Sequence, residues 1–224
     1  EAMMKSSALL QKCSFDEISV LINDALKAGA DADFGYDYIK DFDKRFEFSG
    51  RETITTGWQK MDEITGGGGG RKELGVVVAP TGVGKSMVLV HLGATAVKAG
   101  MTVVHYTLEL RDTVIANRYD SCITGIPLDD LMDRKDEIRE MINNCDGKLI
   151  VKEYPTKTAT TNTIRAHIEK LKQQGIVPDM IIVDYADLLR TLSTRREKRE
   201  ELESIYEELR AIMMEEDVVG WTAS

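Results

Sequence analysis

Hydrophobic and polar positions divide most of this chain into two alternating kinds of segment. Short continuous apolar runs bounded by polar residues or glycine are typical of strands buried on both faces of a sheet. Longer segments between them, with apolar residues three and four positions apart or a helix-favouring composition, predict helices. The predicted strands are residues 74–78, 101–108, 148–154, 180–184 and 218–224, and the predicted helices are residues 87–98, 112–124, 128–143, 163–174 and 197–216. This alternation predicts an α/β fold, in which a mostly parallel sheet lies between two layers of helices.

The N-terminal segment predicts one separate helix over residues 14–28. Ser14 and Glu17 form a capping box at its start, Gly29 provides a stop, and the apolar residues between them lie at helical spacing. A single helix of this length is marginally stable by itself. Its apolar face therefore packs either on its own domain or on a neighbouring subunit, and the sequence leaves both arrangements open.

The next segment, residues 30–50, is acidic and contains scattered aromatic side chains, which indicates an extended arm and not a second globular unit. Five consecutive glycines at 66–70 predict a flexible turn ahead of the first strand. We therefore expect a linker helix and an extended arm over residues 1–50, followed by one α/β domain over residues 51–224.

A phosphate-binding loop lies between the first predicted strand and the helix that follows it. The glycines at 82 and 84 let the backbone curl so that its N–H groups point at phosphate oxygens, and the start of the helix adds partial positive charge. Lys85 is expected to reach the β- and γ-phosphates, and the Ser86 hydroxyl to bind Mg²⁺. A chance glycine-rich turn is the alternative, although the strand, the spacing, the lysine and the serine are all present. The predicted nucleotide-binding residues are Ala79, which stands where a glycine is usual, and Pro80, Thr81, Gly82, Val83, Gly84, Lys85 and Ser86.

Two carboxylates follow other predicted strands. Asp184 ends one apolar run, and Glu109 comes directly after another. Because the carboxyl ends of parallel strands meet at one edge of a sheet, both acids are expected near the phosphate loop. Asp184 is predicted to bind Mg²⁺ together with Ser86. Glu109 and Lys85 are the predicted catalytic residues, and Glu109 is the base that activates water. Tyr185, and not a second acid, follows Asp184, which favours Glu109 as the base. The alternative for Glu109 is a surface glutamate that caps the next helix.

The composition limits the classes of partner. With 42% hydrophobic and 30% charged residues, the chain can bury an ordinary core. No apolar run approaches the roughly 20 residues that span a membrane. Three cysteines without metal-ligand spacing indicate reduced thiols and a cytoplasmic protein. The formal net charge of −9 argues against a broad basic face that coats nucleic acid, although a few basic loops are compatible with it.

One basic cluster follows the strand at 180–184. It consists of Arg190, Arg195, Arg196, Lys198 and Arg199. Basic residues of this kind bind the phosphates of single-stranded DNA without sequence preference and in a salt-dependent way. The alternative is a solvated start of a helix, where the positive charges pair with neighbouring glutamates.

These features together resemble the ATPase domain of DnaB-type replicative helicases, in particular its phage versions. The resemblance covers about residues 50–224 and rests on an ordered set of motifs. The motifs are Thr56-Gly57-Trp58 with residues 61–67 before the phosphate loop, Thr107-Leu108-Glu109-Leu110 around the expected base, Asp184-Tyr185-Ala186-Asp187-Leu188-Leu189 as the Walker B strand and its continuation, and Trp221-Thr222-Ala223-Ser224 as the next strand.

The resemblance implies a RecA-like P-loop NTPase fold that uses ATP and Mg²⁺ and works as a hexameric ring on single-stranded DNA. It further implies a primase and a loader as partners, and the cytoplasm of a bacterium or of a phage-infected cell as the location. Residues 14–28 would be the linker helix that docks on the adjacent subunit. The family's sensor glutamine and arginine-finger segment would follow Ser224, so the domain is expected to be C-terminally incomplete and weakly active as an ATP hydrolase.

Two other functions stay open on the sequence. A recombinase or ATPase of the RecA or KaiC kind shares the same core motifs. A nucleotide-dependent assembly or loader protein would use ATP as a switch with little turnover.

Overall fold

The computed structural model describes residues 35–43, 46, 51–191 and 198–224. The chain divides into two compact units, Glu1–Gly50 and Arg51–Ser224. The helix predicted over residues 14–28 lies outside the described residues. The division of the chain into a linker helix with an extended arm and one α/β domain therefore stays a prediction.

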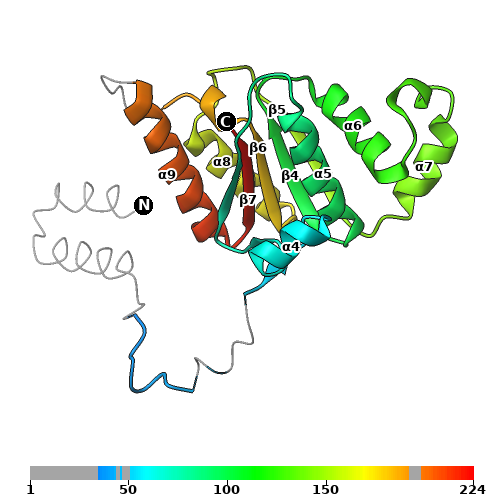
Figure 1. Cartoon of the computed structure of the whole chain (residues 1–224). Helices are drawn as coiled ribbons and strands as arrows, with labels where there is room; N and C mark the ends of the chain where they lie inside the picture. The colour runs from blue at the N-terminus through cyan, green and yellow to red at the C-terminus, as the bar shows by residue number, and fades with distance from the viewer. Residues whose placement is uncertain (1–34, 44–45, 47–50, 192–197) are drawn as a thin grey trace, which may run out of the picture. The chain divides into compact units, whose positions relative to one another are not determined.

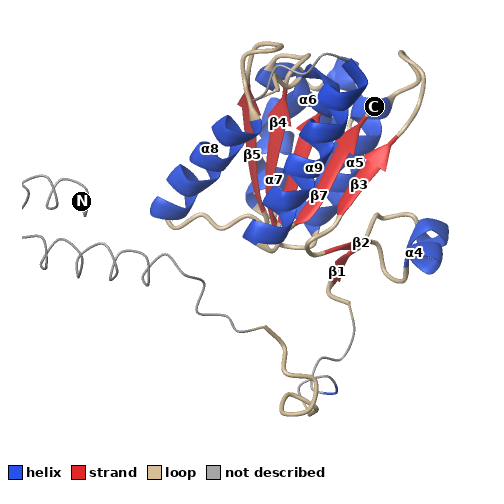
Figure 2. Cartoon of the chain, turned by 90° about the vertical axis from the view of Figure 1, so that its left-hand side faces the viewer, coloured by secondary structure: helices blue, strands red, loops and turns tan. Residues whose placement is uncertain are grey.

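The second unit is built on a five-stranded parallel sheet (Figures 1 and 2). Its strands lie in the order β3-β7-β6-β4-β5, and every neighbouring pair is parallel. The strands are β3 (Leu74–Val77), β4 (Thr102–Thr107), β5 (Lys148–Glu153), β6 (Met180–Asp184) and β7 (Val219–Ala223). All residues of β6 and β7 are buried, as continuous apolar runs in a parallel sheet predict. The predicted strands and their parallel arrangement are confirmed.

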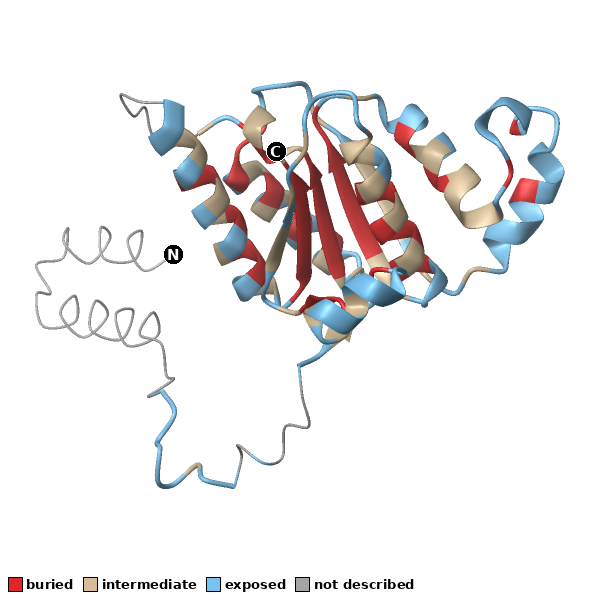
Figure 3. Ribbon diagram, in the orientation of Figure 1, coloured by how far each residue is buried: buried red, intermediate tan, exposed pale blue. Residues whose placement is uncertain are grey.

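Helices cover both faces of this sheet, and Figure 3 shows the strands buried between them. Helices α5 (Lys85–Lys98) and α6 (Asp112–Thr124) lie on one face, and α8 (Thr161–Gln173) and α9 (Lys198–Glu216) on the other. Alternate strand residues face opposite layers because side chains in a strand alternate between its two faces. On β6, Ile182 packs with the α5 layer, and Ile181 packs with the layer of α8 and α9. The predicted three-layer α/β fold is therefore confirmed.

One predicted helix is wrong in its extent. Residues 128–143 form a short 3-10 helix, η1 (Leu128–Asp130), a turn, and then helix α7 (Lys135–Asn143). Three aspartates fall between positions 129 and 133, and aspartate is a weak helix former because its side chain competes for backbone hydrogen bonds. The turn also buries Leu131 with Ile126 and Ile138 in a small separate cluster. Packing of these apolar residues therefore outweighs continuation of the helix.

The glycine run at 66–70 is more ordered than its composition predicts. Strand β2 (Gly69–Gly70) pairs antiparallel with β1 (Thr53–Ile54), and the short helix α4 (Gln59–Thr65) separates the two strands. Gly68 has a φ of +111°, and a Cβ placed there would lie 2.1 Å from the carbonyl oxygen of Ile54. Only glycine permits this approach of two backbones. The prediction of a merely flexible turn was therefore wrong.

Candidate nucleotide-binding site

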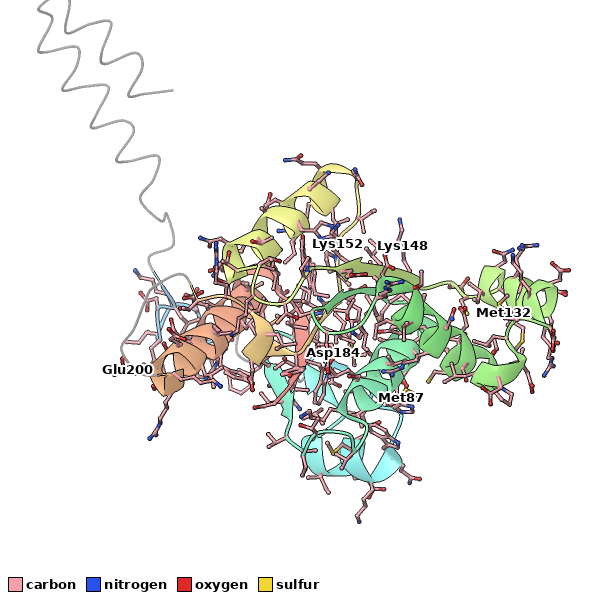
Figure 4. All side chains as sticks on the ribbon, turned by 90° about the horizontal axis from the view of Figure 1, so that it is seen from above. Met87, Met132, Lys148, Lys152, Asp184 and Glu200 are labelled. Atoms are coloured by element: carbon pink, nitrogen blue, oxygen red, sulfur yellow. The ribbon has the colours of Figure 1, made fainter. Side chains whose placement is uncertain are left out.

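The carboxyl ends of β3, β4 and β6 open onto one cavity of about 300 Å³. Figure 4 looks down on this edge of the sheet, with Asp184 near the centre and Met87 on α5 beside it. This cavity is lined by both predicted loop glycines, by both predicted catalytic residues and by Ser86. The full lining is Thr81, Gly82, Gly84, Lys85, Ser86, Met87, Glu109, Leu110, Arg118 and Tyr185. The fold thus brings the phosphate loop and Glu109, which are separate in the sequence, to one place.

The phosphate loop joins β3 directly to α5, as predicted. Gly84 is the N-cap of α5 and has a φ of +100°, a left-handed conformation that other residues rarely adopt. Lys85 Nζ donates a hydrogen bond of 2.8 Å to the carbonyl oxygen of Ala79, so the lysine side chain folds back along the loop. The same ammonium group lies 5.5 Å from the centre of the Tyr185 ring. The lysine ammonium group therefore contacts both the Ala79 carbonyl oxygen and the Tyr185 ring, and its side chain lines the cavity.

Ser86 and Asp184 form the central polar pair of the site. Ser86 Oγ donates a hydrogen bond of 3.2 Å to Asp184 Oδ1, across 98 positions of sequence. Asp184 is fully buried, and its Oδ2 atom has no hydrogen-bond partner among the described residues. Burial raises the pKa of this carboxyl above its ordinary value, against the opposing effect of the Ser86 hydrogen bond. A buried, ionisable carboxylate with one free oxygen, beside a hydroxyl group, has the donor atoms that Mg²⁺ prefers.

Several hydrogen bonds fix the turn that carries Glu109. Leu108 N donates to the carbonyl oxygen of Asp184 at 2.9 Å, which joins this turn to the end of β6. Thr107 Oγ1 donates to the Leu110 carbonyl oxygen at 2.8 Å, and Thr156 Oγ1 donates to that of Leu108 at 2.7 Å. The exposed Glu109 carboxylate therefore stands on a braced turn at the wall of the cavity.

The structure tests the alternative that Glu109 is a surface glutamate that caps the next helix. At the start of α6, the backbone N–H of Asp112 donates to Glu153 Oε2 at 3.1 Å. A glutamate from β5 thus caps this helix, and no hydrogen bond of the described residues gives that role to Glu109. The arrangement favours a role for Glu109 inside the cavity.

Arg118 is a cavity residue that the sequence reasoning missed. It lies on α6, lines the same cavity as Lys85 and Glu109, and its positive charge lowers the pKa of Asp184. Its neighbour Tyr119 fixes α6 to the sheet through a 2.9 Å hydrogen bond between its hydroxyl and Nδ1 of the buried His105. No motif marks Arg118, because its place depends on which face of α6 turns toward the loop.

The three histidines lie in ring contacts and side-chain hydrogen bonds with their neighbours. His91 stacks on Trp58 at 4.1 Å, and His105 is buried with its pKa lowered by burial to about 3. His167 Nδ1 lies 3.0 Å from the hydroxyl of Tyr106. Within the described residues, no group of three histidine, cysteine, aspartate or glutamate side chains is placed to hold a metal ion. A search of the same residues for a helix long and apolar enough to cross a membrane found none.

The predicted DNA-binding cluster is only partly described. Arg195 and Arg196 lie outside the described residues. Arg190 follows η2 (Ala186–Leu188), and its backbone N–H donates to the Ala159 carbonyl oxygen at 2.8 Å. Lys198 and Arg199 are exposed at the start of α9. The DNA-binding role of this cluster stays a prediction.

The fold and the site together define the RecA-like class of P-loop ATPases. Comparison with known proteins narrows the class: the sequence profile described as "DnaB-like helicase C terminal domain" matches residues 53–219. The chain therefore belongs to the DnaB-like helicase C-terminal domain family. This finding confirms the resemblance inferred from the sequence motifs, and it does not favour the RecA or KaiC alternative or the loader alternative.

Curated relatives agree with this assignment. The chain is 30% identical over 218 residues to the DnaB-like replicative helicase of Enterobacteria phage T4, covering 91% of this chain and 46% of that protein. It is 25% identical over 170 residues to the replicative DNA helicase DnaB of Helicobacter pylori strain 26695, covering 74% of this chain and 35% of that protein. The chain thus spans less than half the length of these relatives.

Two solved structures share the fold. One is a DnaB-like replicative helicase described with its interactions with primase, at a TM-score of 0.70 and 15% identity, covering 100% of this chain and 56% of that one. The other is described as an ATPase domain, at a TM-score of 0.68 and 16% identity, covering 87% of this chain and 71% of that one. At these identities the likeness concerns the fold.

Proposed function

We propose that this chain is the ATP-dependent motor domain of a DnaB-type replicative DNA helicase. In this proposal it hydrolyses ATP with Mg²⁺, translocates on single-stranded DNA and unwinds duplex DNA. Membership of the family supports the proposal, and one observation carries it. The hydroxyl of Ser86 is hydrogen-bonded to the buried carboxylate of Asp184, and Ser86 lines the same cavity as Lys85 and Glu109.

The residues at this point fit Mg²⁺. Asp184 Oδ2 is buried without a hydrogen-bond partner among the described residues, and Ser86 Oγ lies beside the other carboxylate oxygen. Both groups are hard oxygen donors, and Mg²⁺ in such sites is held by one or two protein oxygens with phosphate and water. Ser86 and Asp184 would hold the ion, which when bound neutralises charge that develops on the phosphates.

The remaining residues act on the nucleotide directly. Backbone N–H groups of the loop at 79–86 bind the phosphates, and Lys85 exchanges the Ala79 carbonyl oxygen for phosphate oxygens when ATP binds. Glu109 orients the attacking water and accepts its proton. Arg118 adds positive charge on the α6 side of the cavity, opposite in sign to the charge on the transferred phosphate.

The finer parts of the proposal concern the assembled protein. We propose a hexameric ring on single-stranded DNA, with Arg190, Arg195, Arg196, Lys198 and Arg199 as candidate DNA contacts, and a primase and a loader as partners. The replicative helicase relatives and the neighbour described with primase support this view. The cytoplasm of a bacterium or of a phage-infected cell is the corresponding location.

The test of the hydrolytic site is Glu109→Gln in the full-length protein. This change keeps the shape of the side chain and removes its capacity to accept a proton. We expect ATP affinity within about twofold of the unchanged protein, and a turnover number reduced by about 10²-fold or more. Near-normal turnover of ATP would overturn the assignment of Glu109.

The helicase function needs a separate readout. DNA-stimulated ATP hydrolysis and strand separation by the full-length protein would support a motor. Tight ATP binding with no turnover in the presence of DNA would favour a nucleotide-dependent loader instead. The matched control is Glu63→Gln on α4, an exposed glutamate that does not line the cavity, and it is expected to change neither readout.

A further inference from the structure

Hydrogen bonds join the segment that follows Asp184 to the neighbouring strand β7. The backbone N–H of Ala186 donates to Thr222 Oγ1 at 3.0 Å, and the same hydroxyl donates to the Val183 carbonyl oxygen at 2.7 Å. Thr222 is fully buried, so these two bonds are shielded from water. The turn after the metal-binding end of β6 therefore has a fixed place relative to β7.

Asp187, on this turn, receives hydrogen bonds from two elements that are distant in the sequence. Its Oδ1 atom accepts from the Tyr206 hydroxyl of α9 at 2.7 Å, and its Oδ2 atom accepts from Ser224 Oγ at 3.2 Å. Its backbone carbonyl oxygen accepts from Lys157 Nζ at 2.7 Å. Hydrogen bonds to an ionised carboxylate are stronger than bonds between neutral groups. Asp187 thus connects α9 and the end of β7 to the turn that follows β6.

Ser224 continues this connection into the phosphate loop. Its backbone N–H donates to the Val77 carbonyl oxygen at 3.0 Å, and its own carbonyl oxygen accepts from Ala79 N at 3.3 Å. The carbonyl oxygen of Ala79 in turn accepts from Lys85 Nζ at 2.8 Å. A continuous path of hydrogen bonds therefore runs from the Asp187 carboxylate through Ser224 and Ala79 to the lysine of the nucleotide site.

We propose that Asp187 is a positioning residue of the nucleotide site, which sets the place of Ala79 and the phosphate-loop backbone by holding Ser224 at the end of β7. The inference rests on the proposed function and deepens it. Asp187 does not line the cavity, so it acts through Ser224 and not on the nucleotide. A small shift of the loop backbone moves the N–H groups and the ammonium that meet the phosphates, and binding geometry of this kind is sensitive to shifts of an ångström.

The experiment measures binding of a fluorescent ATP analogue with Mg²⁺ to the full chain. Asp187→Asn keeps the shape of the side chain and removes its charge, while Ser224→Ala removes only the hydroxyl that donates to it. We expect each variant to bind the analogue about fivefold more weakly, because each loses one hydrogen bond to a charged group. The double variant is expected to lose no more than either single one, because both changes break the same link.

The control is Arg165→Gln, which breaks the 2.8 Å ion pair between α8 and Glu215 of α9. It perturbs the same helical layer without touching Ser224, and it is expected to leave binding within twofold. A positioning role moves affinity, whereas a merely structural role moves only the melting temperature. The melting temperature of every variant is therefore measured in parallel, and Ser224→Ala alone decides the question if Asp187→Asn does not fold.

The outcomes separate this inference from the function on which it rests. If the unchanged chain does not bind the ATP analogue, the proposed function fails. If the unchanged chain binds and both variants bind as it does, or if the losses in the double variant simply add, the positioning role of Asp187 is overturned.

Discussion

Replacement of Asp184 by asparagine is expected to have opposite effects on the nucleotide-free and the nucleotide-bound protein. In the folded chain this carboxylate is buried, accepts one hydrogen bond from Ser86, and leaves Oδ2 without a partner among the described residues. A neutral amide costs less to bury than a carboxylate. Asp184→Asn is therefore expected to raise the free energy of unfolding of the nucleotide-free protein by about 1 kcal/mol. For a domain of this size, that change corresponds to a rise in melting temperature of about 3 °C.

The same variant is expected to lose the stabilisation that Mg²⁺ and ATP provide. At a ligand concentration of about 100 times Kd, binding stabilises a protein by about 2.7 kcal/mol, which corresponds to a rise of about 8 °C here. Without the Asp184 carboxylate, we expect most of this rise to vanish. The assay is a thermal melt with and without Mg²⁺ and ATP, joined to a Mg²⁺ titration of analogue binding.

The pH dependence of the nucleotide-free melt gives a second check. Because burial raises the pKa of Asp184 in the folded state, the folded chain holds this proton more tightly than the unfolded chain does. The contribution of Asp184 to stability is therefore favourable at low pH, and it is lost as the pH rises above the ordinary value of 3.8 and through the raised value. Asp184→Asn is expected to remove this part of the pH dependence.

The matched control is Asp179→Asn. Asp179 directly precedes the first residue of β6, whereas Asp184 is its last residue. The Asp179 carboxylate pairs with Arg71 at 3.0 Å and accepts from the backbone N–H of Thr102 at 2.9 Å. The same substitution is therefore expected to lower stability there and to leave the Mg²⁺ and ATP effect intact. A destabilised Asp184→Asn variant that still responds fully to Mg²⁺ and ATP would refute the reasoning about this site.

Two further predictions test other parts of the structure. Arg118→Ala is expected to weaken binding of the ATP analogue about tenfold, because a cation of the cavity wall is lost, with Arg118→Lys intermediate; equal binding by all three proteins would remove Arg118 from the site. Gly68→Ala is expected to destabilise the domain by about 3 kcal/mol or more in urea unfolding, because its Cβ would lie 2.1 Å from a backbone oxygen. Gly66→Ala, with open space around the Cβ and a φ of +68°, is expected to cost only about 1 kcal/mol, and similar costs at both positions would contradict the steric argument.

Local patterns in the sequence determined the architecture of the second unit. Short continuous apolar runs are typical of strands buried on both faces of a sheet, and helical segments between them make crossover connections, so the parallel three-layer fold could be predicted from the order of the segments. The phosphate loop could be predicted in the same way, because its residues are contiguous and lie between one strand and one helix. Asp184 and Glu109 were found because each lies at the carboxyl end of a predicted strand, and strand ends of a parallel sheet share one edge.

Contacts between distant segments decided the rest. The glycine run at 66–70 became partly a strand because Gly68 lies against the backbone of Ile54, and the helix expected over residues 128–143 was divided where Leu131 packs with Ile126 and Ile138. Arg118 and the path from Asp187 through Ser224 to Lys85 left no pattern in the sequence. Periodicity reports which face of an element is buried, but it does not report which residue of another element it meets. Only the tertiary structure determines that pairing, and with it the details of the site.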